Sequence, residues 1–392
     1  MSLQPLDKRL RKQLENTIVN ARSIAETAAR SALERLSVGA SKPGEHLTEA
    51  MRQQRNKLRA DGRQLGDIRQ DNAEQGLEHL TQETAYEQWH RMLFARFLAE
   101  NHLLIYEDGV TPLSIQDCFE LAADEEGING WELAGRFASA MLPQLFRAEN
   151  PVLGLHFSPE HQRALEKLLE GLDAETFQAS DSLGWVYQYW QTQKKDEVNK
   201  SGNKIGADEL SAVTQLFTEP YMVSFLLDNS LGAWWVSHYP QYKDLLPFQY
   251  LRYAPEQNDQ ENAEYKETDI PAAGTFKQWP KNLSELKMLD PCCGSGHFLV
   301  ATLLMLVPMR MKAEGLTADE AIARVLSENI HGLELDQRCV EIAAFAVALE
   351  AWRYPESSGY RPLPSLNIAW VGQSKKPKKC STSALNTTSP QM

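Results

Sequence analysis

The stretch Leu289-Asp290-Pro291-Cys292-Cys293-Gly294-Ser295-Gly296-His297-Phe298-Leu299 decides the fold of the C-terminal part of the chain. The apolar residues Leu286, Met288 and Leu289 lead into it and predict a short buried parallel strand. Apolar residues then recur at three- and four-residue spacing as far as Met309, which predicts a helix after the turn. A turn between such a strand and helix lies at the carboxyl end of the strand, where open α/β sheets bind ligands.

The glycines of this turn favour a ligand other than a dinucleotide. Gly294 and Gly296 can adopt positive φ and have no Cβ, so a ligand can approach the backbone closely. Leu299, however, stands where the dinucleotide fingerprint G-x-G-x-x-G needs a third Gly or Ala. A pyrophosphate docked at the start of the helix is therefore disfavoured.

A second strand is predicted at Ile330-His331-Gly332-Leu333-Glu334, after two helical patterns that end near Lys312 and Asn329. Glu334 lies 44 residues after Asp290, whereas dinucleotide sites have their acidic residue about 20 residues on. A carboxylate at this strand end, facing the glycine turn on the neighbouring strand, is placed to accept both ribose hydroxyls of a nucleoside-like cofactor without a diphosphate. S-adenosylmethionine is such a cofactor. The alternative is that Glu334 is only a solvated strand-end carboxylate.

The run Asp290–Phe298 resembles motif I of the adenine-specific DNA methyltransferases, usually written D-P-x-C-G-S-G-x-F. Gly332–Asp336, followed by Cys339–Ala343, resembles motif II of the same family, and Thr214–Val223 resembles motif X, which precedes motif I in it. The resemblance implies an S-adenosylmethionine site. Its implied cofactor-binding residues are Phe217 and Thr218 near the methionine end, Asp290, Pro291, Gly294 and Gly296 around the amino-acid part, and Glu334 with Asp336 at the ribose.

The run Asp181–Trp190, followed by Lys194–Val198, resembles one subgroup of this family. The subgroup comprises the large single-chain, PglX-like methyltransferases of BREX phage defence and related type IIG restriction-methylation enzymes. The resemblance spans roughly residues 75 to 373. It implies double-stranded DNA as the substrate and allows other defence-system subunits as partners.

The motif X segment also predicts a helix on its own residues. Thr218 is suited to cap a helix that begins at Glu219, with Pro220 in its first turn. We expect Met222, Val223, Phe225 and Leu226 to face inward from this helix.

The loop that holds a flipped adenine in this family, Asn/Asp-Pro-Pro-Tyr/Phe, is absent from the sequence, which contains no Pro-Pro pair. A third strand is predicted at Leu366–Gly372, and residues 374–392 form a polar, low-complexity tail that predicts disorder. The expected fold is therefore a mainly α N-terminal region followed by the first part of a truncated, α/β Rossmann-like methyltransferase domain. We assign no catalytic residue and expect that the chain alone does not methylate DNA.

The N-terminal part is predicted to be helical. Residues 6–36 predict a long amphipathic helix with Arg22 on its polar face, and a second helix from His46 carries Arg52, Arg55, Arg59 and Arg63 at near-helical spacing. These basic faces either reach phosphates or, more commonly, are solvated. Further helices are predicted from Thr81 and at 115–121, 131–146 and 159–172. The predicted organisation is a helical segment (1–75), a helical domain (76–190), a linker region that contains the motif X helix (191–285), the start of the methyltransferase domain (286–373) and the tail (374–392). Within the linker region, an exposed loop is predicted at 192–208.

Composition limits the remaining alternatives. The net charge of −13 is awkward for DNA binding, and only residues 1–63 carry a positive surplus, 13 Lys and Arg against 7 Asp and Glu. Five scattered cysteines without C-x-x-C spacing argue against a disulfide framework or a metal site. No apolar run is long enough to span a membrane, and no secretion signal is evident, so we expect a cytoplasmic protein. The rival functions are a non-catalytic DNA- or partner-binding module with a vestigial cofactor site, and a methyltransferase acting on RNA or protein.

Overall fold

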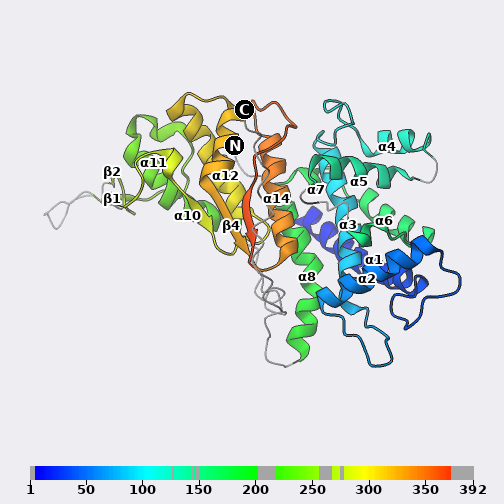
Figure 1. Ribbon diagram of the computed structural model, residues 1–392. Coiled ribbons are helices and arrows are strands. Elements are labelled where there is room, and N and C mark those ends of the chain that lie inside the picture. Colours follow the sequence, from blue (N-terminus) through cyan, green and yellow to red (C-terminus); the bar gives the residue numbers. More distant parts are fainter. Residues whose placement is uncertain are drawn as a thin grey trace, which may run out of the picture. The chain divides into compact units, whose positions relative to one another are not determined.

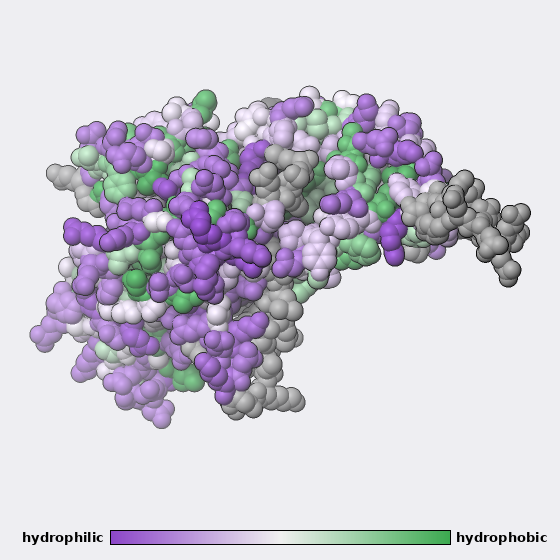
Figure 2. Space-filling view, turned by 180° about the vertical axis from the view of Figure 1, so that it is seen from behind, coloured by the Kyte–Doolittle hydropathy of each residue, from purple (hydrophilic) through white to green (hydrophobic). Residues whose placement is uncertain are grey.

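The computed structural model describes residues 5–125, 128–143, 145, 150–201, 218–255, 267–273 and 278–371. Within these ranges the chain divides into two compact units, one of residues 5–201 and one of residues 218–371 (Figure 1). On the face shown in Figure 2, hydrophilic residues predominate and hydrophobic ones are scattered among them. None of the helices in the described ranges combines the length and the apolar character needed to cross a membrane.

The N-terminal unit is helical, as predicted. Its long helix α3 packs against α1, α2 and α5, and it buries side chains all around its axis, including Trp89, Met92 and Phe94. Most of the helices begin at a side-chain cap, for example at Asp7 before α1 and Asn129 before α5. The helices are α1 (Lys8–Arg35), α2 (Glu49–Leu65), α3 (Glu78–Glu100), α4 (Ile115–Ala122), α5 (Gly130–Met141), η1 (Pro151–Gly154), α6 (Pro159–Glu170), α7 (Glu175–Gln178) and α8 (Ser182–Ser201).

The prediction of an exposed loop at 192–208 is wrong for residues 192–201, because α8 continues to Ser201. Residues 192–200 contain three Lys, one Gln and one Glu, which are good helix formers as well as common loop residues. Val198 is buried and anchors this part of the helix. Residues 202–208 lie outside the described ranges.

Three arginines that the sequence places on polar helix faces are buried instead. Arg22, Arg55 and Arg59 are 6%, 5% and 7% exposed. Arg55 donates from Nε to the Ser37 carbonyl at 2.8 Å and from Nη2 to the Ala40 carbonyl at 2.6 Å. Arg59 donates to the carbonyls of Val38, Ala40 and Ala73, the last two at 2.7 and 2.8 Å.

These contacts correct the view of α2 as a helix with a row of solvent-facing positive charge. The guanidinium groups of Arg55 and Arg59 satisfy carbonyls of the loop that follows α1, and Arg59 also satisfies the Ala73 carbonyl after α2. Burial lowers the pKa of Arg55 and of Arg59 from the ordinary arginine value. Two of the four arginines in the 52–63 series therefore stabilise the fold and are withdrawn from the surface.

The C-terminal unit contains a three-stranded parallel sheet in the order β3-β4-β5. The three predicted strands are all present, and α12 and α14 pack against each other and against β4 (Figure 1). The elements are α10 (Pro220–Leu227), η2 (Asp228–Gly232), α11 (Ala233–His238), η3 (Pro240–Leu245), β1 (Tyr253–Pro255), β2 (Glu267–Pro271), η4 (Leu283–Glu285), β3 (Met288–Asp290), α12 (His297–Glu314), α13 (Ala318–Arg324), η5 (Val325–Asn329), β4 (Ile330–Glu334), α14 (Gln337–Trp352) and β5 (Asn367–Trp370).

The strand before the glycine turn is less buried than predicted. Leu286 is buried, but Leu289 is 58% exposed. β3 lies at one edge of the described sheet, so only β4 pairs with it among the described residues. An apolar run is therefore a reliable sign of the strand here and an unreliable sign of its burial.

The helix α10 also differs from its prediction. It begins at Pro220 with Glu219 in the cap position and without a side-chain cap, so Thr218 lies one residue too early to cap it. Val223 and Leu227 are buried against Ala301 of α12. The other residues expected to face inward are exposed, with fractions of 43% for Met222, 38% for Phe225 and 54% for Leu226. A helix of two turns buries one side, and here residues at i and i+4 form that side.

Candidate functional site

The turn between β3 and α12 is tied to the end of β4 by the backbone. The Cys293 N–H donates to the Leu333 carbonyl at 3.0 Å, and the Gly296 N–H donates to the Cys293 carbonyl at 2.8 Å. The register pairs Asp290 with Gly332. The carboxyl ends of the two strands and the glycine turn are thus held together, as the sequence predicts for a ligand site in an α/β sheet.

The two glycines of the turn are required for different physical reasons. Gly294 has a φ of +51°, and a Cβ placed on it would meet nothing within 4 Å, so the turn is open at this point. Gly296 has a φ of +82°, and its Cβ would lie 2.8 Å from the Cα of Ala343 in α14. Gly294 therefore leaves room for a ligand beside the turn, whereas Gly296 allows α12 to pack closely on α14.

Glu334 is buried at the end of β4, with 5% of its surface exposed. Its Oε2 accepts the Gly294 N–H at 2.8 Å, and its Oε1 accepts the N–H groups of Leu335 and Asp336 at 2.6 and 3.1 Å. The carboxylate thus faces the glycine turn on the neighbouring strand, as predicted. A solvated strand-end carboxylate, the alternative interpretation, is excluded by its burial.

A cavity of about 210 Å³ opens beside the end of β3. Asp290 is its acidic group, and its Oδ1 accepts the Cys292 N–H at 3.1 Å. Burial raises the pKa of Asp290 above its ordinary value, and the nearby negative charge of Glu334 adds to the increase. The lining residues are Leu227, Met288, Leu289, Asp290, Pro291, Phe298, Leu299 and Thr302.

Both cysteines of the turn are poor nucleophiles at neutral pH. Burial raises the pKa of Cys293 to about 12, with further contributions from Asp290 and Glu334. Partial desolvation and the same carboxylates raise the pKa of Cys292. Since the thiolate is the reactive and metal-binding form, these raised pKa values disfavour a nucleophilic or metal-binding role for either residue. Within the described ranges, no group of three His, Cys, Asp or Glu side chains is arranged to hold a metal ion.

The structure brings together Asp290, Pro291, Gly294, Gly296 and Glu334 out of the eight predicted cofactor residues. The other three are placed less directly: Asp336 caps α14 by accepting the Arg338 N–H at 2.9 Å, Thr218 is half-buried just before α10, and Phe217 lies outside the described residues.

The sequence interpretation missed Leu227, the residue by which α10 reaches the cavity. Its position four residues after the buried Val223 is the only signal that marks it. Phe298 and Thr302 of α12 complete the wall.

The chemistry of this site suits a ligand that donates hydrogen bonds. Its charged groups are the carboxylates of Asp290, which lines the cavity, and of Glu334 at the glycine turn, and the residues that line the cavity include no Lys or Arg. Carboxylates attract hydroxyl and ammonium donors and repel phosphates. A ligand with donor groups at one part and an apolar part against Leu227 and Phe298 fits better than a dinucleotide.

Comparison with known proteins finds similarity to methyltransferases. Residues 260–358 match the family described as MmeI, DNA-methyltransferase domain. The adenine-specific methyltransferase PglX of Lacticaseibacillus casei (strain Zhang) is 26% identical over 389 residues, which cover 87% of this chain and 31% of that protein. The adenine-specific methyltransferase BrxX of Escherichia coli O9:H4 (strain HS) is 28% identical over 214 residues, 54% of this chain and 17% of that protein. A PglX of Streptomyces coelicolor is 36% identical over 81 residues, 20% of this chain and 6% of that protein. The chain thus spans less than a third of the length of each of these relatives.

Proposed function

Because this chain is related to the PglX-like adenine-specific methyltransferases, we propose that it binds S-adenosylmethionine at the turn between β3 and α12. The observation that carries the proposal is the buried carboxylate of Glu334, bonded to the Gly294 N–H beside the Asp290 cavity. This arrangement lies inside the segment that matches a methyltransferase family. The finer assignment, an enzyme that methylates adenine N6 in DNA, is part of the proposal.

Glu334 is the residue proposed to bind the ribose. A carboxylate offers about four acceptor positions, and three are taken by the N–H groups of Gly294, Leu335 and Asp336. Its Oε2 accepts one bond, so this oxygen has an acceptor position for a ribose hydroxyl without breaking the turn. A second hydroxyl would compete with one of the local amides of the turn after β4.

Asp290 is proposed to bind the amino-acid part of the cofactor, with Pro291, Gly294 and Gly296 shaping the backbone beside it. The positive charge of an ammonium group would oppose the two factors that raise the pKa of Asp290, its burial and the negative charge of Glu334. The lack of a Cβ at Gly294 leaves the approach open. When bound, the cofactor supplies the methyl group, and the residues of this chain hold and orient it.

The segment before α10 is proposed to lie near the methionine end of the cofactor. This proposal covers Phe217 and Thr218, and it is supported by the contact that Leu227 of the same helix makes with the cavity. Asp336, next to Glu334, is proposed to belong to the ribose side of the site.

The proposed substrate is adenine in double-stranded DNA, and the proposed setting is phage defence of the BREX type or restriction-modification, with other defence subunits as possible partners in the cytoplasm. The relatives are named adenine-specific methyltransferases, and the motif X, I, II order supports DNA as the target. The printed sequence contains no Asn/Asp-Pro-Pro-Tyr/Phe loop to hold a flipped base. We therefore propose that the chain by itself binds the cofactor without transferring its methyl group.

Titration calorimetry with S-adenosylmethionine tests the proposal. We expect measurable affinity for the unmodified chain and strongly reduced affinity for E334A. If the folded chain has no affinity, the cofactor site is refuted and the non-catalytic binding module becomes the better interpretation. A single-turnover assay with tritiated cofactor and double-stranded DNA tests the second part, since transfer to adenine by this chain alone would contradict it.

A further inference from the structure

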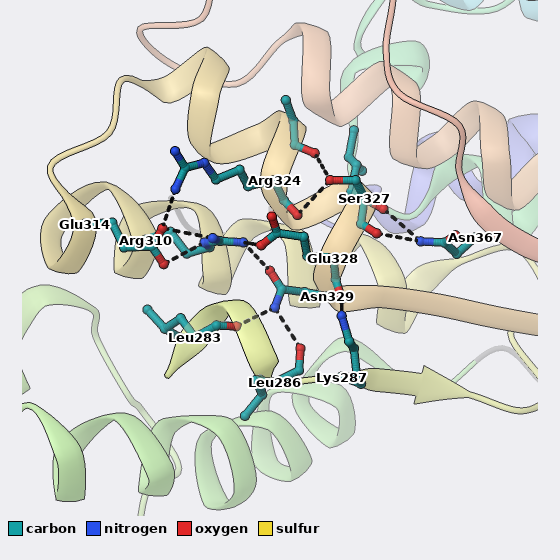
Figure 3. Close-up of polar contacts among 12 residues, drawn as sticks. Leu283, Leu286, Lys287, Arg310, Glu314, Arg324, Ser327, Glu328, Asn329 and Asn367 are labelled. Atoms are coloured by element: carbon teal, nitrogen blue, oxygen red, sulfur yellow. Dashed lines mark hydrogen bonds and ion pairs between the residues drawn. The ribbon is translucent and has the colours of Figure 1, made fainter. Parts of the chain in front are cut away.

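An ionic cluster centred on a buried arginine lies at the amino ends of the strands whose carboxyl ends form the proposed cofactor site. This Arg310 cluster consists of Arg310, Glu314, Glu328 and Asn329 (Figure 3). The fully buried guanidinium of Arg310 donates from Nε and Nη2 to the two oxygens of Glu314, both at 2.9 Å. Its Nη1 donates to Glu328 at 2.6 Å and to the Oδ1 of Asn329 at 3.1 Å. The charge of Arg310 is thus balanced and its orientation is fixed.

Asn329 connects this cluster to the chain before β3. Its Nδ2 donates to the carbonyls of Leu283 and Leu286, both at 2.7 Å, and the whole side chain is buried (Figure 3). Asn329 is also the last residue of the π-helical turn η5 and directly precedes β4. One side chain therefore joins the chain segments just before two paired strands.

This connection matters because β3 is only three residues long. Its register pairs Met288 with Ile330 and Asp290 with Gly332. So short a strand has few ladder bonds with which to select that register. A slip by one residue would move Asp290 to the other face of the sheet and pull Gly294 away from Glu334.

We infer that Asn329, oriented by Arg310, is a positioning residue that fixes the register of β3 against β4 and thereby places Asp290 and Gly294 beside Glu334. The inference about the cofactor rests on the proposed function, whereas the inference about the register does not. Leu286 and Asp290 are four residues apart, about 13 Å along a strand. Asn329 therefore acts on the site from its far end, through the strand itself.

The chain offers a matched control at the neighbouring strand. Asn367 begins β5 and likewise donates from Nδ2 to two carbonyls, those of Leu326 and Ser327, at 3.3 and 3.1 Å. N329D and N367D each replace two amide donors by carboxylate oxygens at the same end of the sheet. Only N329D affects the chain before β3.

Amide hydrogen exchange at the site reads the register directly. The reporters are the N–H of Cys293, bonded to Leu333, and the N–H of Gly294, bonded to Glu334, with the amides of α14 as the reference for global unfolding. Relative to that reference, we expect N329D to accelerate exchange at both reporters about tenfold, as the loss of two hydrogen bonds allows. We expect N367D to accelerate exchange at Val371, whose N–H bonds the Glu334 carbonyl, and to leave the two reporters unchanged.

Titration with S-adenosylmethionine provides the second readout. We expect N329D to bind the cofactor about tenfold more weakly and N367D to bind it with unchanged affinity. Exchange that rises equally at the reporters and in α14, or at neither, would overturn the inference and leave Asn329 a stabilising residue only. If the unmodified chain binds no cofactor, the proposed function fails while the exchange result still decides the register. If N329D does not fold, hydrogen exchange at the same two amides is measured in R310K. This variant keeps the charge and removes the planar donors.

Discussion

Replacement of Glu334 is the sharpest perturbation of the proposed site. E334A removes three hydrogen bonds at once, but the three differ in their cost. The amides of Leu335 and Asp336 belong to the turn after β4, and Leu335 is 51% exposed, so water can replace their partner. The Gly294 bond joins two strand ends and ends on a buried carboxylate, which gives it the strength of a charge-assisted bond, about 1.5–3 kcal/mol.

The free energy of unfolding of the C-terminal unit should therefore fall by about 2 kcal/mol in E334A, which lowers Tm by roughly 4–8 °C in a unit of this size. Affinity for S-adenosylmethionine should fall up to about a hundredfold, because the ribose hydroxyl at the open position of Oε2 loses a charged acceptor. E334Q separates the two effects. Its oxygen can still accept the local amides, but its NH2 group then faces the Gly294 N–H, donor against donor.

We expect E334Q to bind the cofactor about ten- to a hundredfold more weakly while it loses less stability than E334A. Calorimetry gives the affinity, thermal unfolding gives Tm, and hydrogen exchange of Gly294 reports the bond itself. E350Q is the control, because Glu350 is equally buried on α14 but bonds Arg353 instead of the turn. Unchanged affinity and unchanged Gly294 exchange in E334Q would show that the carboxylate is not a ligand group.

Other predictions follow from the turn, its acidic group and the helical unit. G296A should destabilise the protein by more than about 2 kcal/mol, because a positive φ and a backbone contact with Ala343 both oppose a methyl group. G294A should cost only about 1 kcal/mol of strain but should weaken cofactor binding. Urea unfolding measures the change in stability, and calorimetry measures the change in affinity. Since the folded-state pKa of Asp290 is raised above 3.8, the stability it contributes is present below its unfolded-state pKa and is lost as the pH rises through the folded-state pKa. D290N should remove this loss, so that the variant is the more stable form at neutral pH and the weaker cofactor binder; a pH series of urea unfolding that shows the opposite order would contradict the raised pKa. R59A should cost the helical unit about 3 kcal/mol in urea unfolding, because it leaves the carbonyls of Val38 and Ala73 without this donor, while the Ala40 carbonyl keeps Arg55, and cofactor affinity should not change.

The sequence predicts the backbone geometry around the candidate site well where local rules decide it. The strands, the glycine turn and the position of Glu334 follow from the apolar runs and from the rule that the carboxyl ends of parallel strands meet at one edge of a sheet. Positive φ at Gly294 and Gly296 follows from the same turn. What the motif does not reveal is why each glycine is required, since the contact of Gly296 with Ala343 depends on how two helices pack.

The predictions from sequence fail where the burial of a residue depends on partners that are distant in the sequence. The exposed residues of α10 and the cavity contact of Leu227 depend on the position of α12, which no pattern within eight residues specifies. Residues 192–201 are polar whether they form a loop or the end of α8. The division of the chain into five parts, the truncation and the assignment of Phe217 remain predictions.

The buried arginines of α2 change what a salt titration would measure. The affinity of a protein for DNA falls with salt in proportion to the number of phosphates that its cations neutralise, because each such contact releases a condensed counterion. The guanidinium groups of Arg55 and Arg59 already bind main-chain carbonyls, so they have no phosphate to meet and no counterion to release. If the helical unit contacts DNA, the slope of log affinity against log salt will be set by exposed residues such as Lys57 and Arg69, and will be shallower than the number of arginines in its sequence suggests.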